Sequence, residues 1–218
     1  MPAACLALVT SRRQLSPGAR TMRDEWVALD AFLDDALEAR VDVIQIREPD
    51  VDSGMLCKQV EGLVRRASTS GVRIVVNDRA DVALASGAHG VHLPARGLPP
   101  VRLRSLMPEA IVGRSMHKDD LPDETGLDYL LFGTVFASRS KPGLKPAGLE
   151  ALAEVSARSS IPVLAIGGIT PARVGACLDA GATGVAAIGA FLPPGRSPDA
   201  MGVAVAVQAF RKALSRIC

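Results

Sequence analysis

One histidine in this sequence stands where it could carry out acid–base chemistry. His117 follows an apolar run in the stretch SMHKDD, and an imidazole can take up and return a proton near neutral pH. We therefore expect His117 to be catalytic, with the alternative that it caps the following helix or lies exposed. Asp78 is a second catalytic candidate, and its alternative is to cap a helix over 79–87. His92 alternates with an apolar neighbour, which favours an inward-facing, hydrogen-bonded residue.

Other polar side chains also follow apolar runs, as substrate-binding groups at strand ends would. Amide, guanidinium and hydroxyl groups in these places can orient a polar ligand without reacting with it. The predicted substrate-binding residues at strand ends are Gln45, Arg47, Asn77 and Ser115.

Two glycine-bearing stretches near the C-terminus predict a phosphate site. The stretches AIGGIT (165–170) and GVAAIGA (184–190) each place glycine at the end of an apolar run. Glycine lets backbone N–H groups approach an anion, and a helix that starts there adds a favourable dipole. The predicted phosphate-binding residues are Gly167, Gly168, Gly189 and Ala190. The alternative is that Gly167 and Gly168 only make a tight turn between a strand and a helix.

The widest polar stretch, ASRSKPGLKPAG (137–148), is long enough to cover a site as a flexible lid. Lys141 could neutralise a phosphate or pyrophosphate, with Ser138 and Ser140 beside it. The alternative is a lysine that is only solvated.

The elements that must position these residues alternate between short strands and helices. Runs rich in β-formers are separated by segments of helical length, and the C-terminal 202–210 stretch follows a helix cap and is also predicted helical. The predicted strands are 5–10, 42–48, 73–78, 90–94, 110–116, 128–133, 161–168 and 184–189. This order predicts an α/β fold, a single (β/α)8 TIM barrel over residues 1–218, with a doubly wound open sheet as the alternative.

Composition limits the classes of partner. The chain has 218 residues, 48% hydrophobic and 3% aromatic, which suits one domain with an Ala, Val, Leu and Ile core. Its 25 basic and 23 acidic residues are nearly balanced, so we expect no nucleic acid partner. No apolar run reaches the ~20 residues of a membrane span, so we expect no membrane partner. Four widely spaced cysteines predict a reduced cytoplasmic protein without structural zinc.

Several stretches, taken in order, resemble the thiamine phosphate synthase and thiazole tautomerase (TenI-like) superfamily of barrels. The resemblance covers residues 5 to 192, and although each motif alone is weak, the ordered set is specific. The stretches that carry it are QIRE, VVNDRADVALASGAHGVHLP, VGRSMH, GTVFASRSKPG and IPVLAIGGI.

Two departures from the synthase pattern determine which branch we expect. The resemblance implies two carboxylates that bind magnesium, of which Asp78 matches the first while Gly97 stands at the second. It also implies a lysine after Gln45 and Arg47, where this chain has Pro49. We therefore expect no metal site, and no cofactor unless the chain is a synthase, which would need magnesium.

The resemblance then implies a thiazole tautomerase of thiamine biosynthesis, an isomerase acting on a phosphorylated thiazole. His117 would remove the ring proton and return one to the exocyclic carbon. One alternative is thiamine phosphate synthase, which joins thiazole phosphate to hydroxymethylpyrimidine pyrophosphate. Another is a barrel that binds a phosphorylated ligand without catalysis. A homodimer is open as the oligomeric state.

Overall fold

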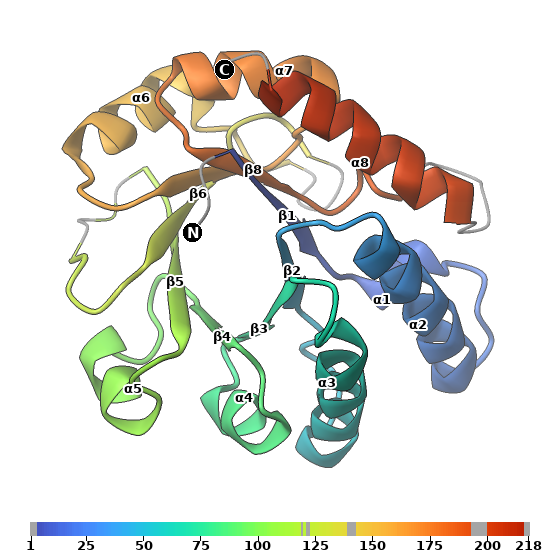
Figure 1. Ribbon diagram of the computed structural model, residues 1–218. Helices are drawn as coiled ribbons and strands as arrows, with labels where there is room; N and C mark the ends of the chain where they lie inside the picture. The colour runs from blue at the N-terminus through green and yellow to red at the C-terminus, as the bar shows by residue number, and fades with distance from the viewer. Residues whose placement is uncertain (1–3, 119, 121–122, 139–142, 193–199, 216–218) are drawn as a thin grey trace.

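The strands of this protein close into a parallel barrel (Figure 1). The computed structural model describes residues 4–118, 120, 123–138, 143–192 and 200–215, with the side chains of Ala200 and Met201 left aside. Within them, eight strands pair in chain order and β8 pairs with β1. The strands are β1 (Cys5–Val9), β2 (Val43–Ile46), β3 (Arg73–Asn77), β4 (Gly90–Leu93), β5 (Ile111–Met116), β6 (Tyr129–Gly133), β7 (Val163–Ile166) and β8 (Gly184–Ala187). The predicted (β/α)8 barrel is confirmed, and the open sheet is wrong.

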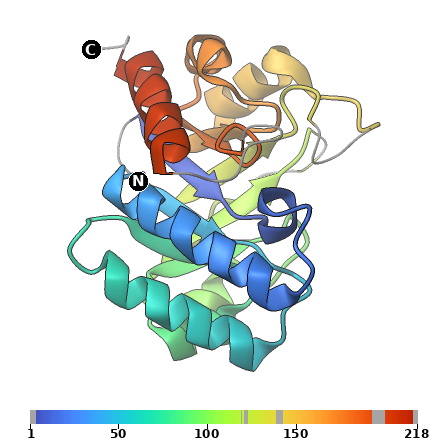
Figure 2. The same ribbon diagram turned by 90° about the vertical axis from the view of Figure 1, so that its right-hand side faces the viewer.

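Helices surround the barrel (Figures 1 and 2). Those of the described residues are α1 (Arg12–Leu15), α2 (Met22–Glu38), α3 (Ser53–Ala67), α4 (Ala80–Ser86), α5 (Pro100–Leu106), α6 (Gly148–Arg158), α7 (Pro171–Asp179) and α8 (Ala200–Leu214). The prediction that the C-terminal stretch is helical is confirmed, and α8 packs beside α2. None of these helices has the length and hydropathy to cross a membrane.

Local chemistry explains where α2 begins and ends. Thr21 and Asp24 form a reciprocal capping box, with the Asp24 backbone N–H donating to Thr21 Oγ1 at 3.1 Å. This cap satisfies free donors of the first turn, so the helix begins at Met22. At the other end Arg40 takes a left-handed backbone conformation with φ of 55°, which stops the helix.

Apolar side chains fill two separate layers. One lies inside the barrel and is built mainly from small and β-branched residues such as Ala7, Val43 and Val75. The larger layer lies between the barrel wall and the helices. Because both faces of a parallel strand are buried, its sequence is an apolar run without alternation, and polar residues stand out where the strand ends.

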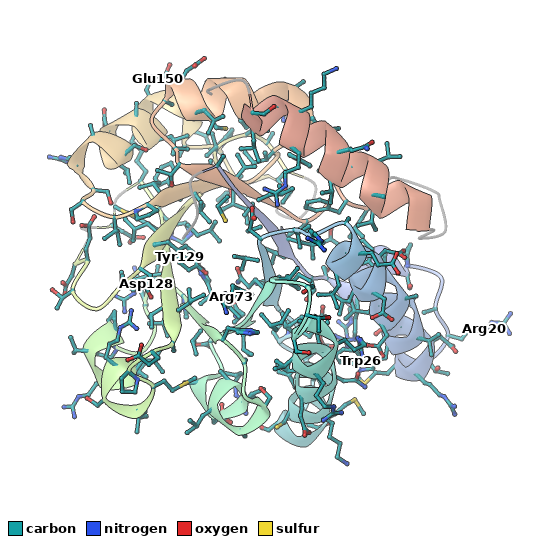
Figure 3. The ribbon with its side chains drawn as sticks, in the orientation of Figure 1. Arg20, Trp26, Arg73, Asp128, Tyr129 and Glu150 are labelled. Carbon is teal, nitrogen blue, oxygen red and sulfur yellow. The ribbon has the colours of Figure 1, made fainter. Side chains whose placement is uncertain are left out.

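Two aspartates that directly precede a strand tie the barrel wall to helices. Asp42, before β2, accepts from the Leu6 backbone N–H at 2.7 Å and from Arg211 of α8 at 2.7 Å. Asp128, labelled in Figure 3, lies before β6. It accepts from the Val112 backbone N–H at 2.7 Å and from Arg104 of α5 at 2.6 Å. We call these two arrangements the Asp42 clamp and the Asp128 clamp.

Candidate active site

The carboxyl ends of the strands bring predicted substrate-binding residues together on β2 and β3. Gln45 is buried, Asn77 is half-buried, and Gln45 Nε2 donates to Asn77 Oδ1 at 3.0 Å. This bond fixes the orientation of both amides. Gln45 Oε1, the second N–H of Gln45 Nε2 and the Asn77 amide NH2 group then remain available to bind a ligand.

Ser115 on β5 is hydrogen-bonded to the buried His92 of β4, which is in turn hydrogen-bonded to the buried Tyr129 of β6. His92 Nε2 lies 2.9 Å from Ser115 Oγ, and His92 Nδ1 lies 3.0 Å from the Tyr129 hydroxyl. His92 is fully buried, so its prediction as an inward-facing, hydrogen-bonded residue is confirmed. Burial, and secondarily the positive charge of Arg47, lowers the pKa of His92 to about 3. The imidazole is therefore neutral over the physiological pH range.

Arg47 and Asp78 are exposed at the same end of the barrel. The backbone N–H of Arg47 donates to Thr10 Oγ1 at 2.9 Å, which fixes the start of the loop after β2. Asp78 has a left-handed backbone with φ of 64°, and its N–H donates to the His92 carbonyl at 2.8 Å. Arg79 is the N-cap residue of α4, and the structure gives this helix no side-chain cap. The capping alternative for Asp78 is therefore wrong, and its catalytic role stays a prediction.

His117 lies just beyond β5 in a turn closed by Asp120. The backbone N–H of His117 donates to Asp120 Oδ2 at 2.7 Å, and Nδ1 lies 3.2 Å from the same oxygen. Half of the side chain is exposed. The alternative of an exposed residue in a local turn accounts for this geometry, and a catalytic role for His117 stays a prediction.

Gly167 and Gly168 follow β7 with positive φ angles of 101° and 64°. A Cβ at Gly167 would lie 2.4 Å from Thr134 Cγ2, and one at Gly168 would lie 2.4 Å from the Ala137 carbonyl oxygen. Glycine is thus required by the turn itself, as the alternative reading proposed, whether or not a phosphate binds. Gly189 differs, because a Cβ there would meet no described atom within 4 Å. Beside it, Ala190 is half-buried.

An arginine that sequence reasoning missed lies against this glycine turn. Arg173 donates from Nη1 to the Gly168 carbonyl at 2.6 Å, and its guanidinium lies 4.6 Å from the Phe136 ring centroid. Its side chain is exposed. Arg173 sits in the first turn of α7, and nothing in its sequence spacing distinguishes it from a solvated helix arginine.

The loop after β6 is described only in part. Ser138 is half-buried. The other two predicted residues of this loop, Ser140 and Lys141, lie outside the described residues, and so does the centre of the predicted lid.

A second arginine that sequence reasoning missed holds the loops after β1 and β2 together. Arg12 is fully buried and pairs with Glu48 at 2.9 Å, with Asp50 at 2.7 Å and with Glu25 at 2.8 Å. Its guanidinium also lies 5.9 Å from the Trp26 ring centroid. The hydrogen bond from Arg12 lowers the pKa of Asp50 to about 2. We call these five residues the Arg12 cluster.

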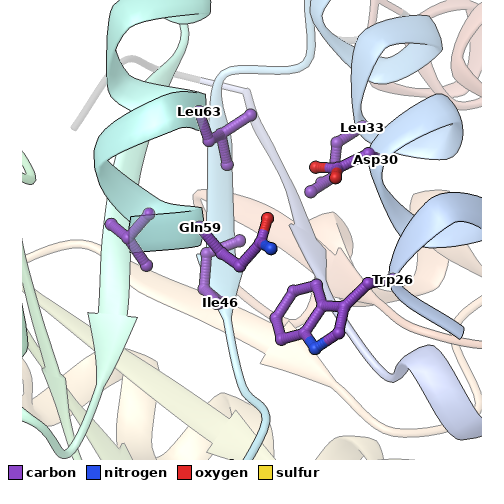
Figure 4. Close-up of a pocket in the computed structure, with 7 residues that line it drawn as sticks. Trp26, Asp30, Leu33, Ile46, Gln59 and Leu63 are labelled. Carbon is purple, nitrogen blue, oxygen red and sulfur yellow. The ribbon is translucent and has the colours of Figure 1, made fainter. Parts of the chain in front are cut away.

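A small crevice lies outside the barrel wall, between α2 and α3 (Figure 4). Trp26 and Asp30 of α2 face Gln59 and Leu63 of α3 across it, with Ile46 of β2 as its floor. Trp26 Nε1 is buried there without a hydrogen-bond partner among the described residues. This crevice is a packing gap between helices and has no part of the barrel mouth in its lining.

The loop after β4 explains why an acid is absent at position 97. The Gly97 N–H donates to the Pro94 carbonyl at 3.0 Å in a tight turn. A Cβ at this position would lie 2.7 Å from Pro94 Cδ and 2.9 Å from Pro94 Cγ. An aspartate at position 97 would therefore force the Pro94 ring or the loop to shift.

Magnesium is commonly held by one or two carboxylates together with substrate phosphates. Asp78, exposed at the rim, can supply one such carboxylate, whereas Glu48 and Asp50 are occupied by Arg12. The described residues contain no cluster of three or more acidic, histidine or cysteine side chains suited to a metal ion. At the rim, the carboxylate of Asp78 is therefore the group that these residues offer to a magnesium ion.

A family model described as thiamine monophosphate synthase matches residues 21–191. The chain belongs to this family. Thiamine-phosphate synthase of Chlorobium luteolum is 39% identical over 160 residues, which cover 71% of this chain and 76% of that relative. Thiamine-phosphate synthase of Laribacter hongkongensis is 40% identical over 162 residues, which cover 72% and 76%. Among solved structures, thiamine phosphate pyrophosphorylase from Pyrococcus furiosus gives a TM-score of 0.78 at 26% identity, over 98% of this chain and 96% of that one.

These family members correct the expected activity. Pro49 and Gly97 favour a thiazole tautomerase, an isomerase, when the sequence is taken alone. That prediction is wrong, because the relatives at 39% and 40% identity are named thiamine-phosphate synthases, which are transferases. Pro49 and Gly97 are two departures within a chain that otherwise matches the family over residues 21–191.

Proposed function

We propose that this chain is a transferase of the thiamine-phosphate synthase type. Its substrates would be a thiazole phosphate and a hydroxymethylpyrimidine activated as its pyrophosphate. The observation that carries the proposal is the gathering of polar groups on β2 to β5 at the same end of the barrel as the glycine turn after β7. The names of the relatives support the same reaction class.

In the proposed reaction the thiazole nitrogen forms a bond to the pyrimidine methylene carbon. The bond from that carbon to the pyrophosphate oxygen breaks, and pyrophosphate leaves with the electron pair. The protein must therefore hold two phosphorylated molecules at one end of the barrel and stabilise charge on the departing group.

We assign the phosphate of the thiazole to the glycine turn. Backbone N–H groups of Gly167, Gly168, Gly189 and Ala190 are the proposed donors, and the first turn of α7 adds its dipole. Arg173, exposed beside Gly168, is the proposed cation. The open space around Gly189 leaves room for the anion at this point of the rim.

We assign the pyrophosphate to the opposite side of the rim, where Arg47 and Asp78 are exposed. Magnesium held by Asp78 would neutralise charge on the leaving pyrophosphate. Arg47 would bind its oxygens directly, and Ser115 would donate a hydrogen bond. Gln45 and Asn77, fixed by their mutual hydrogen bond, would orient the pyrimidine.

A turnover assay tests this function. The purified chain is mixed with thiazole phosphate, the pyrimidine pyrophosphate and magnesium, and released pyrophosphate and thiamine phosphate are measured together. We expect equal amounts of both products, dependence on magnesium, and a loss of rate in the Asp78→Asn variant, which keeps shape but removes the charge.

Two other outcomes would contradict the proposal. Binding of thiazole phosphate with no product, although a known synthase turns over in the same assay, would identify a phosphate-ligand-binding barrel without catalysis. Full turnover by Asp78→Asn with no effect of a metal chelator would remove the assigned role of Asp78. The oligomeric state stays open between a monomer and a homodimer, and sedimentation of the purified chain tests it.

A further inference from the structure

Three neighbouring strands align His92, Gly113 and Tyr129 in one row across the barrel interior. His92 of β4 pairs with Gly113 of β5, and Gly113 pairs with Tyr129 of β6. A Cβ at Gly113 would lie 2.0 Å from Tyr129 Cζ. The tyrosine ring therefore lies over the glycine, and its hydroxyl reaches the histidine two strands away. Tyr129 is labelled on β6 in Figure 3.

The row continues to the rim through Ser115. This residue is two positions beyond Gly113 on β5, so both belong to the same face of the strand. His92 Nε2 lies 2.9 Å from Ser115 Oγ, and Nδ1 lies 3.0 Å from the tyrosine hydroxyl. Ser115 is half-buried, whereas His92 is fully buried and Tyr129 is 2% exposed. The chain of hydrogen bonds thus runs from the closed interior to the open mouth.

The direction of each hydrogen bond follows from the chemistry of the partners. A neutral imidazole has one N–H donor and one acceptor nitrogen. Among the described residues, the Tyr129 hydroxyl has one hydrogen-bond partner, His92 Nδ1. A buried hydroxyl that donated to nothing would be costly, so the tyrosine donates to Nδ1. His92 then carries its proton on Nε2 and donates it to Ser115 Oγ.

We propose that Tyr129 and His92 are positioning residues that keep the Ser115 hydroxyl as a hydrogen-bond donor toward the pyrophosphate of the substrate. With its oxygen occupied by the histidine N–H, Ser115 has its own proton free for an acceptor at the rim. The opposite tautomer would let Ser115 donate to Nε2, and its oxygen would then face the anion without a proton. This inference rests on the proposed function for the identity of the anion.

The tautomer can be measured without any assay of activity. Nitrogen-15 NMR of histidine-labelled protein distinguishes a protonated Nε2 from a protonated Nδ1. We expect His92 to be neutral and protonated on Nε2 from about pH 5 to about pH 8. In Tyr129→Phe, which keeps the ring over Gly113 but removes the donor, we expect the Nδ1-protonated form to appear.

Binding of inorganic pyrophosphate with magnesium, measured by calorimetry, tests the consequence. Ser115→Ala should weaken binding about tenfold or more, because it removes a hydrogen bond to a charged group. Tyr129→Phe should weaken binding severalfold in the parent background, and should change nothing further in Ser115→Ala. A purely structural role for Tyr129 would instead give the same weakening in both backgrounds. If Tyr129→Phe folds poorly in either background, variants of His92 take its place. His92→Gln, which keeps one donor and one acceptor, should then retain more affinity than His92→Met.

Three results would overturn the inference. They are an Nδ1-protonated His92 in the parent protein, additive effects of Tyr129→Phe and Ser115→Ala, and no binding of pyrophosphate by the parent protein. Coupled effects on pyrophosphate binding in a chain that makes no thiamine phosphate would instead sustain this inference and contradict the proposed function.

Discussion

At the scale of single residues, Gly168 and Gly189 distinguish a glycine that the backbone needs for folding from a glycine that is proposed only to bind phosphate. Gly168 has a φ of 64°, and a Cβ there would lie 2.4 Å from the Ala137 carbonyl oxygen. A Cβ at Gly189 would meet no described atom within 4 Å. Both are proposed to donate to the same phosphate. Their alanine variants therefore report on different properties.

We predict that Gly168→Ala loses about 1–3 kcal/mol of the free energy of unfolding, because alanine is strained at this φ and meets the Ala137 carbonyl. Gly189→Ala should keep the stability of the parent but bind phosphate more weakly, because its methyl group enters the space assigned to the anion. Urea unfolding and calorimetry with inorganic phosphate check the pair. A Gly189→Ala variant with the parent's phosphate affinity would remove Gly189 from the site.

His92 predicts how stability depends on pH. Its pKa is about 3 in the folded protein, lowered by burial, and about 6.5 in an unfolded chain. Below about pH 6.5 the unfolded chain takes up a proton that the folded protein does not, so stability falls as the pH drops toward 3.

At about pH 5 we expect His92 to cost about 2 kcal/mol relative to about pH 7. Between about pH 7 and about pH 5, His92→Gln should therefore lose about 2 kcal/mol less of its free energy of unfolding than the parent protein loses. Urea unfolding of both proteins measures the difference. His89, whose pKa burial also lowers, is present in both and cancels. An identical loss in the variant would show that His92 does not titrate as described.

Residue types at the rim could be predicted from sequence, but their partners could not. Gln45, Asn77 and Ser115 were found as polar residues at strand ends, since apolar runs make such residues conspicuous. Arg12 and Arg173 were missed, because their partners lie on other elements and a lone arginine has no period or spacing to mark it.

At the scale of elements, the Arg12 cluster predicts how strongly the first two loops depend on one side chain. Arg12→Met would leave Glu48, which is 5% exposed, as a buried carboxylate without its cation. We expect a loss of about 3–5 kcal/mol. Arg13→Met is the matched control, because Arg13 pairs with Asp50 while 68% of its side chain is exposed, and it should cost less than about 1 kcal/mol. Equal losses measured by urea unfolding would contradict the central position of Arg12.

The loop after β4 predicts a dependence between two substitutions. Gly97→Asp alone should destabilise the protein by about 1–3 kcal/mol, because its Cβ meets the Pro94 ring. Pro94→Gly combined with Gly97→Asp should recover most of that loss and bind magnesium pyrophosphate more tightly than the parent. Thermal unfolding and calorimetry test both effects. Tolerance of the single variant without loss would show that the loop adjusts freely.

The order and type of elements could be predicted because strands and helices have different periods and the turns between them carry glycine, proline and aspartate. The predicted ends of every strand lie within two residues of the observed ones. The limits of α2 could not be predicted from the apolar pattern, since they depend on a capping box and on a left-handed arginine, which are features of backbone geometry.

At the scale of the whole molecule, the closed barrel followed from eight strands alternating with helices, whereas the activity did not follow from two departures in a motif. Pro49 and Gly97 lie in loops, which vary while the barrel and its remaining rim residues persist. Fold and reaction class are therefore carried by different parts of this chain.

The Asp42 clamp and the Asp128 clamp also differ in the stage of synthesis at which all of their partners are present. The partners of Asp128 lie 16 and 24 residues away, so this clamp forms soon after its segment is made. Asp42 is hydrogen-bonded to Leu6, which is 36 residues away in the sequence, and to Arg211, which is 169 residues away. During synthesis β1 therefore keeps an unpaired edge until β8 follows, and α8 then completes the Asp42 clamp. Nascent chains arrested before Arg211 has left the ribosome should be cut readily by protease, those arrested after it should resist, and Arg211→Ala should delay that resistance.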